Sequence, residues 1–218
     1  MILVEAAVET ADSALAAEHA GADRIELCAN LDEGGTTPSQ ALIASVAERS
    51  KLRVFVMVRP RAGGFVFSDD DFAAMVRDIE LIGAMSIAGI VTGVLTSEAQ
   101  VDVERMRILV QAAGDLPVTF HRAIDSTVNI AAALEDTIEA GASRVLTSGG
   151  AATALEGTDV IAALVNQARG RISIVAGGGI RQHNAREVIA RTGVREVHAR
   201  FVDQAQMGGL VDAVKRNS

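Results

Sequence analysis

The sequence predicts a single (β/α)₈ barrel, the TIM-barrel class of α/β fold, with residues 1–218 forming one domain. Short runs of β-branched residues alternate with alanine-rich amphipathic segments along the whole chain. A helical pattern follows each of eight runs that are expected to be strands. These strands are residues 2–6, 24–28, 53–58, 88–92, 117–121, 144–147, 172–176 and 195–198. Strands that alternate with helices form parallel sheets with right-handed crossovers, and eight of them in a chain of this length suit a closed barrel.

The junctions between elements also repeat. A glycine, suited to the left-handed conformation that ends a helix, stands just before four of the expected strands: Gly21, Gly114, Gly141 and Gly193. Residues 37–40 are typical of a capping box with proline at the first helical position, and residues 68–71 resemble another. An open doubly wound sheet is the alternative fold, although no G-x-G-x-x-G motif follows the first strand.

The composition excludes several classes of partner. A net charge of -8 and an aromatic content of 3%, with no Trp or Tyr, argue against nucleic-acid binding, which needs a basic surface and stacking rings. The single cysteine, Cys28, allows no internal disulfide and fits a reducing compartment. No apolar run approaches the roughly 18 residues of a membrane span, and no signal-like segment precedes the first strand. A cytoplasmic protein is therefore expected.

Polar residues and glycines gather at the expected C-terminal ends of the strands, where barrels of this class carry their active sites. They are Glu5, Glu26, Cys28, Asn30, Arg59, Arg61, His121, Arg122, Ser148, Gly149, Gly177, Gly178, Gly179 and His198. Because side chains alternate between the two faces of a strand, Glu26 shares a face with Cys28, as His198 does with Glu196. Their apolar neighbours suit the helix-facing side, so the polar set is expected to point into the barrel. An interior ion pair between Glu26 and an arginine is the alternative explanation.

These residue types indicate acid–base chemistry on an anionic ligand. Glu26 and His121 are candidates for proton transfer, because a carboxylate and an imidazole can be tuned to opposite roles near neutral pH. His198 and Arg59 complete the catalytic candidates, and Arg59 and Arg122 are expected to clamp an anion. The Gly177–Gly179 turn, with Ser148 and Gly149 one strand away, is expected to hold a phosphate. Glu5, Asn30 and Arg61 join this ligand-binding set. A tight turn that needs positive φ explains either glycine group as well.

The evidence for a metal site is weaker. Glu26, His121 and His198 could hold a divalent ion, although no H-x-x-x-H or C-x-x-C spacing is present. Cys28 and Met57 are soft ligands of the kind that Cu(I) prefers. A lone buried cysteine is more often a small core residue than a metal ligand.

Several long segments resemble the CutC family, which is named for copper homeostasis. They include residues 21–30, 33–39, 118–123 and 144–149, with Arg59-Pro60-Arg61, Gly177–Gly179 and residues 196–198. The resemblance runs from residue 1 to about residue 199 and implies a cytoplasmic (β/α)₈ barrel that forms a homodimer or larger oligomer and takes part in copper binding or trafficking. Some members carry cysteines on the first strand, where this chain has Glu5-Ala6-Ala7, and the segment after His198 is short here.

Two functions are therefore expected to compete. The first is a copper-homeostasis protein that binds or transfers Cu(I), with Cys28 as the soft ligand. The second is a barrel enzyme that acts on a small anionic, phosphorylated or polyhydroxy substrate at the C-terminal face.

Overall fold

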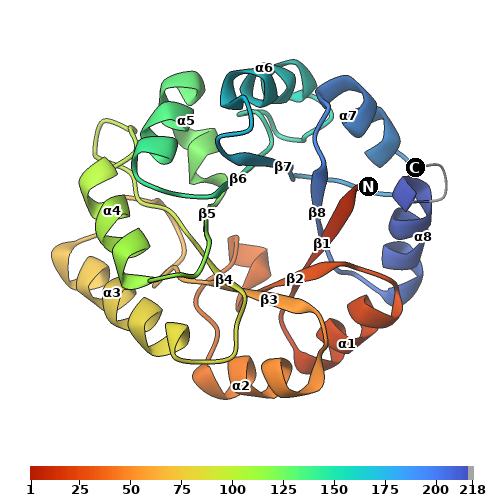
Figure 1. Cartoon of the computed structure of the whole chain (residues 1–218), viewed down its shortest axis with the longest axis horizontal. Helices are drawn as coiled ribbons and strands as arrows, with labels where there is room; N and C mark the ends of the chain where they lie inside the picture. Colours follow the sequence, from red (N-terminus) through yellow and green to blue (C-terminus); the bar gives the residue numbers. More distant parts are fainter. Residues whose placement is uncertain (216–218) are drawn as a thin grey trace.

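The computed structural model describes residues 1–215 and shows a closed barrel of eight parallel strands surrounded by helices (Figure 1). The strands pair in chain order: β1 (Leu3–Val8), β2 (Arg24–Leu27), β3 (Arg53–Met57), β4 (Gly89–Thr92), β5 (Val118–Phe120), β6 (Arg144–Thr147), β7 (Ser173–Ala176) and β8 (Glu196–Arg200). β8 pairs with β1 and closes the ring. The predicted barrel and its eight strands are confirmed, and the doubly wound alternative is excluded.

One α-helix follows each strand and packs on the outside of the barrel (Figure 1). The helices are α1 (Ala11–His19), α2 (Gln40–Arg49), α3 (Asp69–Gly83), α4 (Val103–Ala112), α5 (Ile130–Glu139), α6 (Thr158–Ala168), α7 (Ala185–Thr192) and α8 (Gln204–Lys215). Short 3₁₀ turns, η1 (Leu31–Glu33) and η2 (Arg122–Ser126), follow β2 and β5. Within residues 1–215, no helix has the length and hydropathy needed to cross a bilayer.

The helix ends follow the predicted signals with one correction. The glycines expected at helix ends have positive φ: Gly21, Gly114, Gly141 and Gly193. Ser68 caps α3 by accepting a hydrogen bond from the amide of Asp71. The capping box predicted at residues 37–40 is wrong in register, because the N-cap of α2 is Ser39. The Thr37 hydroxyl instead accepts a hydrogen bond from the Arg59 amide, which ties this loop to the end of β3.

Each strand separates two apolar regions. Outward residues such as Ile25, Leu27 and Val197 belong to the large core between the barrel and its helices. A small inner cluster consists of Cys28, Phe55, Met57 and Val91. The division matches the predicted alternation, so the polar residues that share parity with the inner cluster face the barrel interior.

The N-terminal half of the interior holds a network of buried ion pairs. Glu5 accepts hydrogen bonds from Arg24 Nε at 2.5 Å and from Arg144 Nη2 at 2.9 Å. The same two arginines reach Glu196, whose Oε2 lies 2.6 Å from Arg24 Nη2 and 3.2 Å from Arg144 Nε. The Phe55 ring centroid lies 5.1 Å from Arg24 Cζ and 4.6 Å from Arg144 Cζ. Two cations and two anions balance here, and the network forms a closed floor beneath the C-terminal mouth.

Candidate functional site

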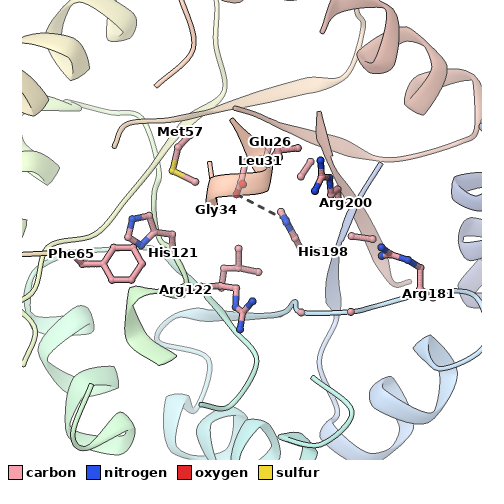
Figure 2. A pocket seen from close by; sticks show the side chains of 15 residues that line it. Glu26, Leu31, Gly34, Met57, Phe65, His121, Arg122, Arg181, His198 and Arg200 are labelled. Carbon is pink, nitrogen blue, oxygen red and sulfur yellow. Dashed lines mark ion pairs between the residues drawn. The ribbon is translucent and has the colours of Figure 1, made fainter. Parts of the chain in front are cut away.

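A cavity of about 320 Å³ opens at the C-terminal mouth of the barrel (Figure 2). It is lined by strand ends and the loops after them: Ala7, Glu26, Leu31, Gly34, Met57, Phe65, His121, Arg122, Leu146, Gly178, Gly179, Arg181, His198, Ala199 and Arg200. In Figure 2, His121 and Phe65 lie on one side, Arg181 and Arg200 on the other, and Glu26 and His198 between them. The volume is at the small end of ligand sites, which suits a small metabolite.

Glu26 and His198 form a pair on the floor of this cavity. The two side chains approach with 4.0 Å between Glu26 Oε2 and His198 Nδ1, the contact dashed in Figure 2. Glu26 is 3% exposed, and its Oε2 atom has no hydrogen-bond partner among the described residues. Burial raises the pKa of the Glu26 carboxyl above its ordinary value, and the nearby Glu5 charge adds to the shift. A buried carboxylate with one oxygen free of hydrogen bonds is suited to accepting and releasing a proton.

His198 is held in place from below by Glu5. Its Nδ1 atom lies 2.8 Å from Glu5 Oε1, so Nε2 is the ring nitrogen left for the cavity. Burial opposes ionisation of this imidazole, but the charge of Glu26 and the hydrogen bond to Glu5 outweigh it, and the net effect raises the pKa of His198. Glu5 itself stays ionised, because Arg144 overcomes the effect of burial and holds the pKa of Glu5 well below its usual range. The carboxylate fixes the orientation of the ring, as orienting carboxylates do in catalytic dyads.

His121 lies just beyond β5, at the start of η2. Its Nδ1 accepts a hydrogen bond from the Ala123 amide at 3.2 Å, so the neutral ring carries its proton on Nε2. That Nε2 atom is buried and has no partner among residues 1–215. Burial and the Arg59 charge lower the pKa of His121 to about 3. His121 is therefore a neutral hydrogen-bond donor at physiological pH, which differs from the predicted role of an acid or base.

The neutrality of His121 predicts a specific acid sensitivity. The folded-state pKa lies below the unfolded value, so this group's contribution to stability is complete above about pH 6.5 and is lost as the pH falls toward 3. In that window the free energy of unfolding of the wild type should fall relative to that of His121→Gln, by up to about 1.4 kcal/mol per pH unit. Urea unfolding of both proteins at several pH values checks this. A difference in unfolding free energy between the two proteins that does not change with pH would contradict this prediction.

Arg122 and the glycine turn after β7 form one side of the mouth. Arg122 donates from Nε to Asp125 and from Nη2 to Ser148 Oγ, which leaves Nη1 without a partner in the described chain. Its Cζ lies 3.5 Å from the position of a Cβ built on Gly178. Gly178 and Gly179 have φ of +104° and +71°, and neither amide donates a hydrogen bond within residues 1–215. A guanidinium beside free backbone amides is a common site for phosphate or carboxylate.

Asp125 holds this side of the mouth together. It accepts hydrogen bonds from the Thr147 hydroxyl at 2.5 Å, from the amide and hydroxyl of Ser148, and from the Gly150 amide. These bonds connect η2 to the end of β6 and orient Arg122. Ser148 and Gly149 thus support the cavity wall but do not line the cavity. Gly177 packs against Leu146 and His198.

Two lining arginines were not predicted from the sequence. Arg200 lies two residues after His198 on β8 and therefore shares its inward parity, a signal that could have identified it. Its Nη1 lies 2.6 Å from Asp32, which draws η1 toward the mouth. Arg181 follows the glycine turn in an irregular loop, where no periodic pattern applies. It donates only to the neighbouring Ile180 carbonyl and has no ion pair among the described residues.

Besides Glu5, Ser148, Gly149 and Gly177, three further predicted site residues lie outside the cavity lining. Arg59 is 3% exposed and donates to the backbone carbonyls of Glu33, Gly35 and Gly63, which holds two loops together. Both terminal nitrogens of its guanidinium are thus bonded to the backbone, so Arg59 is not placed to clamp an anion as expected. Arg61 pairs with Asp71 on the surface. The Asn30 amide donates to the Thr36 hydroxyl and stabilises the turn after β2.

The predicted metal candidates separate into different environments. The ligand atoms of Glu5, Glu26 and His198 all lie within 4.8 Å of one another, and His121 is not part of this group. Glu5 already accepts from two arginines, so the group is a hydrogen-bonded network and we do not assign it as a metal site. The alternative explanation of Glu26, an interior ion pair with an arginine, is not what the structure shows, because Arg24 and Arg144 pair with Glu5 and Glu196.

Comparison with known proteins identifies relatives across nearly the whole chain. The sequence profile of the CutC family matches residues 2–202. A family protein CutC from Xanthomonas axonopodis pv. citri is 50% identical over 196 residues, covering 90% of this chain and 82% of that protein. Another from Photobacterium profundum is 40% identical, covering 95% and 89%. A Streptococcus agalactiae structure named for copper homeostasis superimposes with a TM-score of 0.87 at 33% identity, covering 93% of this chain and all of that one. Phosphoribosylanthranilate isomerase from Thermotoga maritima, at 12% identity and a TM-score of 0.66, shares the fold alone.

Proposed function

This chain belongs to the CutC family. We propose that it is an enzyme that removes a proton from a small anionic substrate, and returns it, at the mouth of the barrel. The observation that carries the proposal is the Glu26–His198 pair, a buried carboxylate with a free oxygen beside an oriented imidazole. Burial of a carboxylate oxygen without a hydrogen-bond partner is unfavourable, and the interior arginines are bonded elsewhere. Such unpaired groups in a cavity favour a functional over a structural role.

The pair is built to exchange a proton. Glu26 and His198 both have pKa values shifted upward, so each favours its protonated form more strongly than it would in water. Either group can then serve as acid while the other serves as base near neutral pH. Glu5 and Glu196 with their two arginines form the floor and together carry no net charge, and Glu5 holds the imidazole in one orientation.

The rim supplies the attraction for an anion. Arg122 and Arg181 both lie near the Gly178–Gly179 turn, and the amides of that turn lie beside Arg122 (Figure 2). Arg200 is partly neutralised by Asp32, whereas Arg181 has no carboxylate partner among residues 1–215. Arg181 is therefore the cation most available to a phosphate or carboxylate group.

A ligand that binds the folded protein should raise its melting temperature by mass action. We expect inorganic phosphate and small phosphorylated or carboxylate metabolites to stabilise the wild type, and Arg181→Ala to lose most of that shift. Arg191→Ala is the matched control, because Arg191 lies in the last turn of α7 at the opposite end of the barrel. Thermal unfolding with and without each anion is the measurement. Equal shifts in all three proteins, or none, would reject the anion site.

Copper is the alternative ligand, suggested by the name of the Streptococcus agalactiae protein. Cu(I) prefers thiolate and thioether ligands, and a thiol must ionise to bind it well. The Cys28 side chain is fully buried, and its Sγ donates to Glu26 Oε1 at 3.4 Å. Burial raises the pKa of Cys28 well above its ordinary value, and the Glu26 charge raises it further. The donor set therefore does not fit a Cu(I) site at Cys28.

We expect Cu(I) titration to give the same weak binding for the wild type and for Cys28→Ala. Alanine removes the thiol while keeping a small apolar side chain beside Phe55 and Met57, so the fold should be retained. A competition assay with a Cu(I) chelator measures the affinity. Stoichiometric binding that disappears in Cys28→Ala would instead support the copper function.

A further inference from the structure

One buried polar atom in the wall of the cavity is not used by the proposed proton transfer. The Nε2 atom of His121 is buried and has no partner among the described residues, although the ring lines the same cavity as Glu26. A buried donor left unpaired is unfavourable, and each such group in a folded protein calls for a ligand, a water or a functional explanation. The site therefore offers a fixed N–H donor in addition to a base and an anion-binding rim.

The surroundings of His121 fix the direction of this donor. The hydrogen bond from Ala123 to Nδ1 holds the tautomer, and the Phe65 ring packs against the imidazole with 5.0 Å between ring centroids. A Cβ on Gly93 would lie 2.6 Å from both Cε1 and Nδ1 of the ring, so only glycine at this position leaves room for it. Three elements thus position one N–H group, which is the arrangement expected of a group that must meet a substrate atom in one place.

A neutral, oriented N–H donor is suited to an oxygen that becomes negative during the reaction. A buried carboxylate is suited to removing a proton from the neighbouring carbon. We infer that the substrate is a small carbonyl compound that carries a phosphate or carboxylate group, with its carbonyl oxygen at His121 Nε2 and its adjacent carbon at Glu26. This inference rests on the proposed function and specifies its substrate class.

The chemical step needs no other reactant. The Glu26 carboxylate takes the proton from the carbon next to the carbonyl, and the electron pair of that C–H bond forms a carbon–carbon double bond. The π electrons of the carbonyl move onto its oxygen, which is stabilised by the His121 N–H as an enolate. The Glu26 carboxylic acid then returns the proton to the same carbon, or to the former carbonyl carbon if a hydroxyl proton moves to the first oxygen. His198 can relay that second proton.

Exchange of the carbon-bound proton for deuterium tests the inference directly. The protein is incubated in deuterium oxide with dihydroxyacetone phosphate, with other phosphorylated ketoses and with 2-oxo acids, and the loss of each α-proton signal is followed by NMR. Uncharged dihydroxyacetone is the control for the anionic group. We expect the wild type to exchange at least one anionic compound faster than the enzyme-free solution, and dihydroxyacetone much more slowly.

Two changes test the role of His121 itself. His121→Leu removes the donor and should lower kcat for exchange on the order of 10²–10³-fold, with a much smaller change in KM. His121→Gln keeps an N–H donor and should recover part of the rate. Gly93→Ala keeps the His121 side chain but shifts its position, and should also lower kcat. A loss confined to KM, or equal rates in all variants, would overturn the assignment.

Thermal stabilisation by anions and deuterium exchange together distinguish a failure of this inference from a failure of the proposed function. If anions stabilise the wild type but none of the compounds exchanges, the carbonyl substrate class is wrong and the anion site stands. If no anion stabilises the protein and none exchanges, the proposed function fails with it. Exchange of the uncharged compound at the same rate would remove the requirement for an anionic group.

Discussion

Glu5→Ala should destabilise the protein by about 3–5 kcal/mol, because it removes one side of a buried ion network. The carboxylate of Glu5 is 1% exposed and contacts Arg24, Arg144 and His198. Without it, two buried guanidinium groups share only Glu196, and His198 loses its orienting partner. The loss is a large fraction of the stability of a typical domain. The chain has no Trp or Tyr, so urea unfolding is best followed by far-UV circular dichroism.

Two companion variants make this prediction specific. Glu135→Ala removes a carboxylate that pairs with Arg171 on the surface, and should change stability far less. The double variant Glu5→Ala/Arg144→Met removes one of the stranded charges and should recover part of the loss. If Glu5→Ala lowers the unfolding free energy no more than Glu135→Ala does, the buried ion network does not stabilise the barrel as predicted.

Glu26→Gln should strongly slow proton transfer while leaving the fold intact. Removal of a general acid or base typically lowers the rate on the order of 10²–10⁴-fold, and Gln keeps the size and shape of the side chain. Anion binding should persist, because the arginines and glycine amides of the rim are unchanged. The readouts are deuterium exchange and the melting-temperature shift with phosphate, compared with Glu48→Gln on the exposed face of α2. Wild-type exchange rates in Glu26→Gln would exclude Glu26 as the base.

The same variant should gain stability relative to the wild type as the pH rises above the ordinary pKa of a glutamate carboxyl, about 4.3. The folded-state pKa of Glu26 is raised, so its contribution to stability is complete below the unfolded pKa and is lost as the pH rises through the folded value. Gln remains neutral and avoids this loss, so the difference in unfolding free energy should grow with pH until the folded-state pKa of Glu26 is passed, and should then stay constant. The pKa of His198 should also fall in this variant, because the Glu26 charge that raises it is gone. NMR titration of the imidazole measures that shift.

The barrel itself could be predicted because its signals are local. Each strand is marked by a short run of β-branched residues, and helix ends are marked by a glycine or a capping serine. The eight strands could therefore be predicted with boundaries within about two residues of those in the structure. Parity along single strands then placed Glu26, His121 and His198 on the inner face. These inferences need only neighbouring residues, and the closed barrel confirmed the fold that they indicate.

The partners of the charged side chains could not be predicted in this way. Glu5 meets Arg144 across 139 positions of sequence, and Arg24 meets Glu196 across 172. Those pairings depend on the stagger between strands, which sets the height of each inward residue in the barrel. A long, flexible guanidinium can also turn away from the mouth, as Arg59 does to bind three loop carbonyls.

The sequence by itself therefore determined the fold class and the inward face that carries Glu26, His121 and His198, because alternation and capping act over a few residues. Only the tertiary structure decided that the interior arginines neutralise Glu5 and leave Glu26 free. It also decided that His121 stays neutral and that Arg181 and Arg200 complete the rim. Burial, charge balance and hydrogen-bond partners depend on what surrounds a group in space, and that environment exists only once the strands have closed into a barrel.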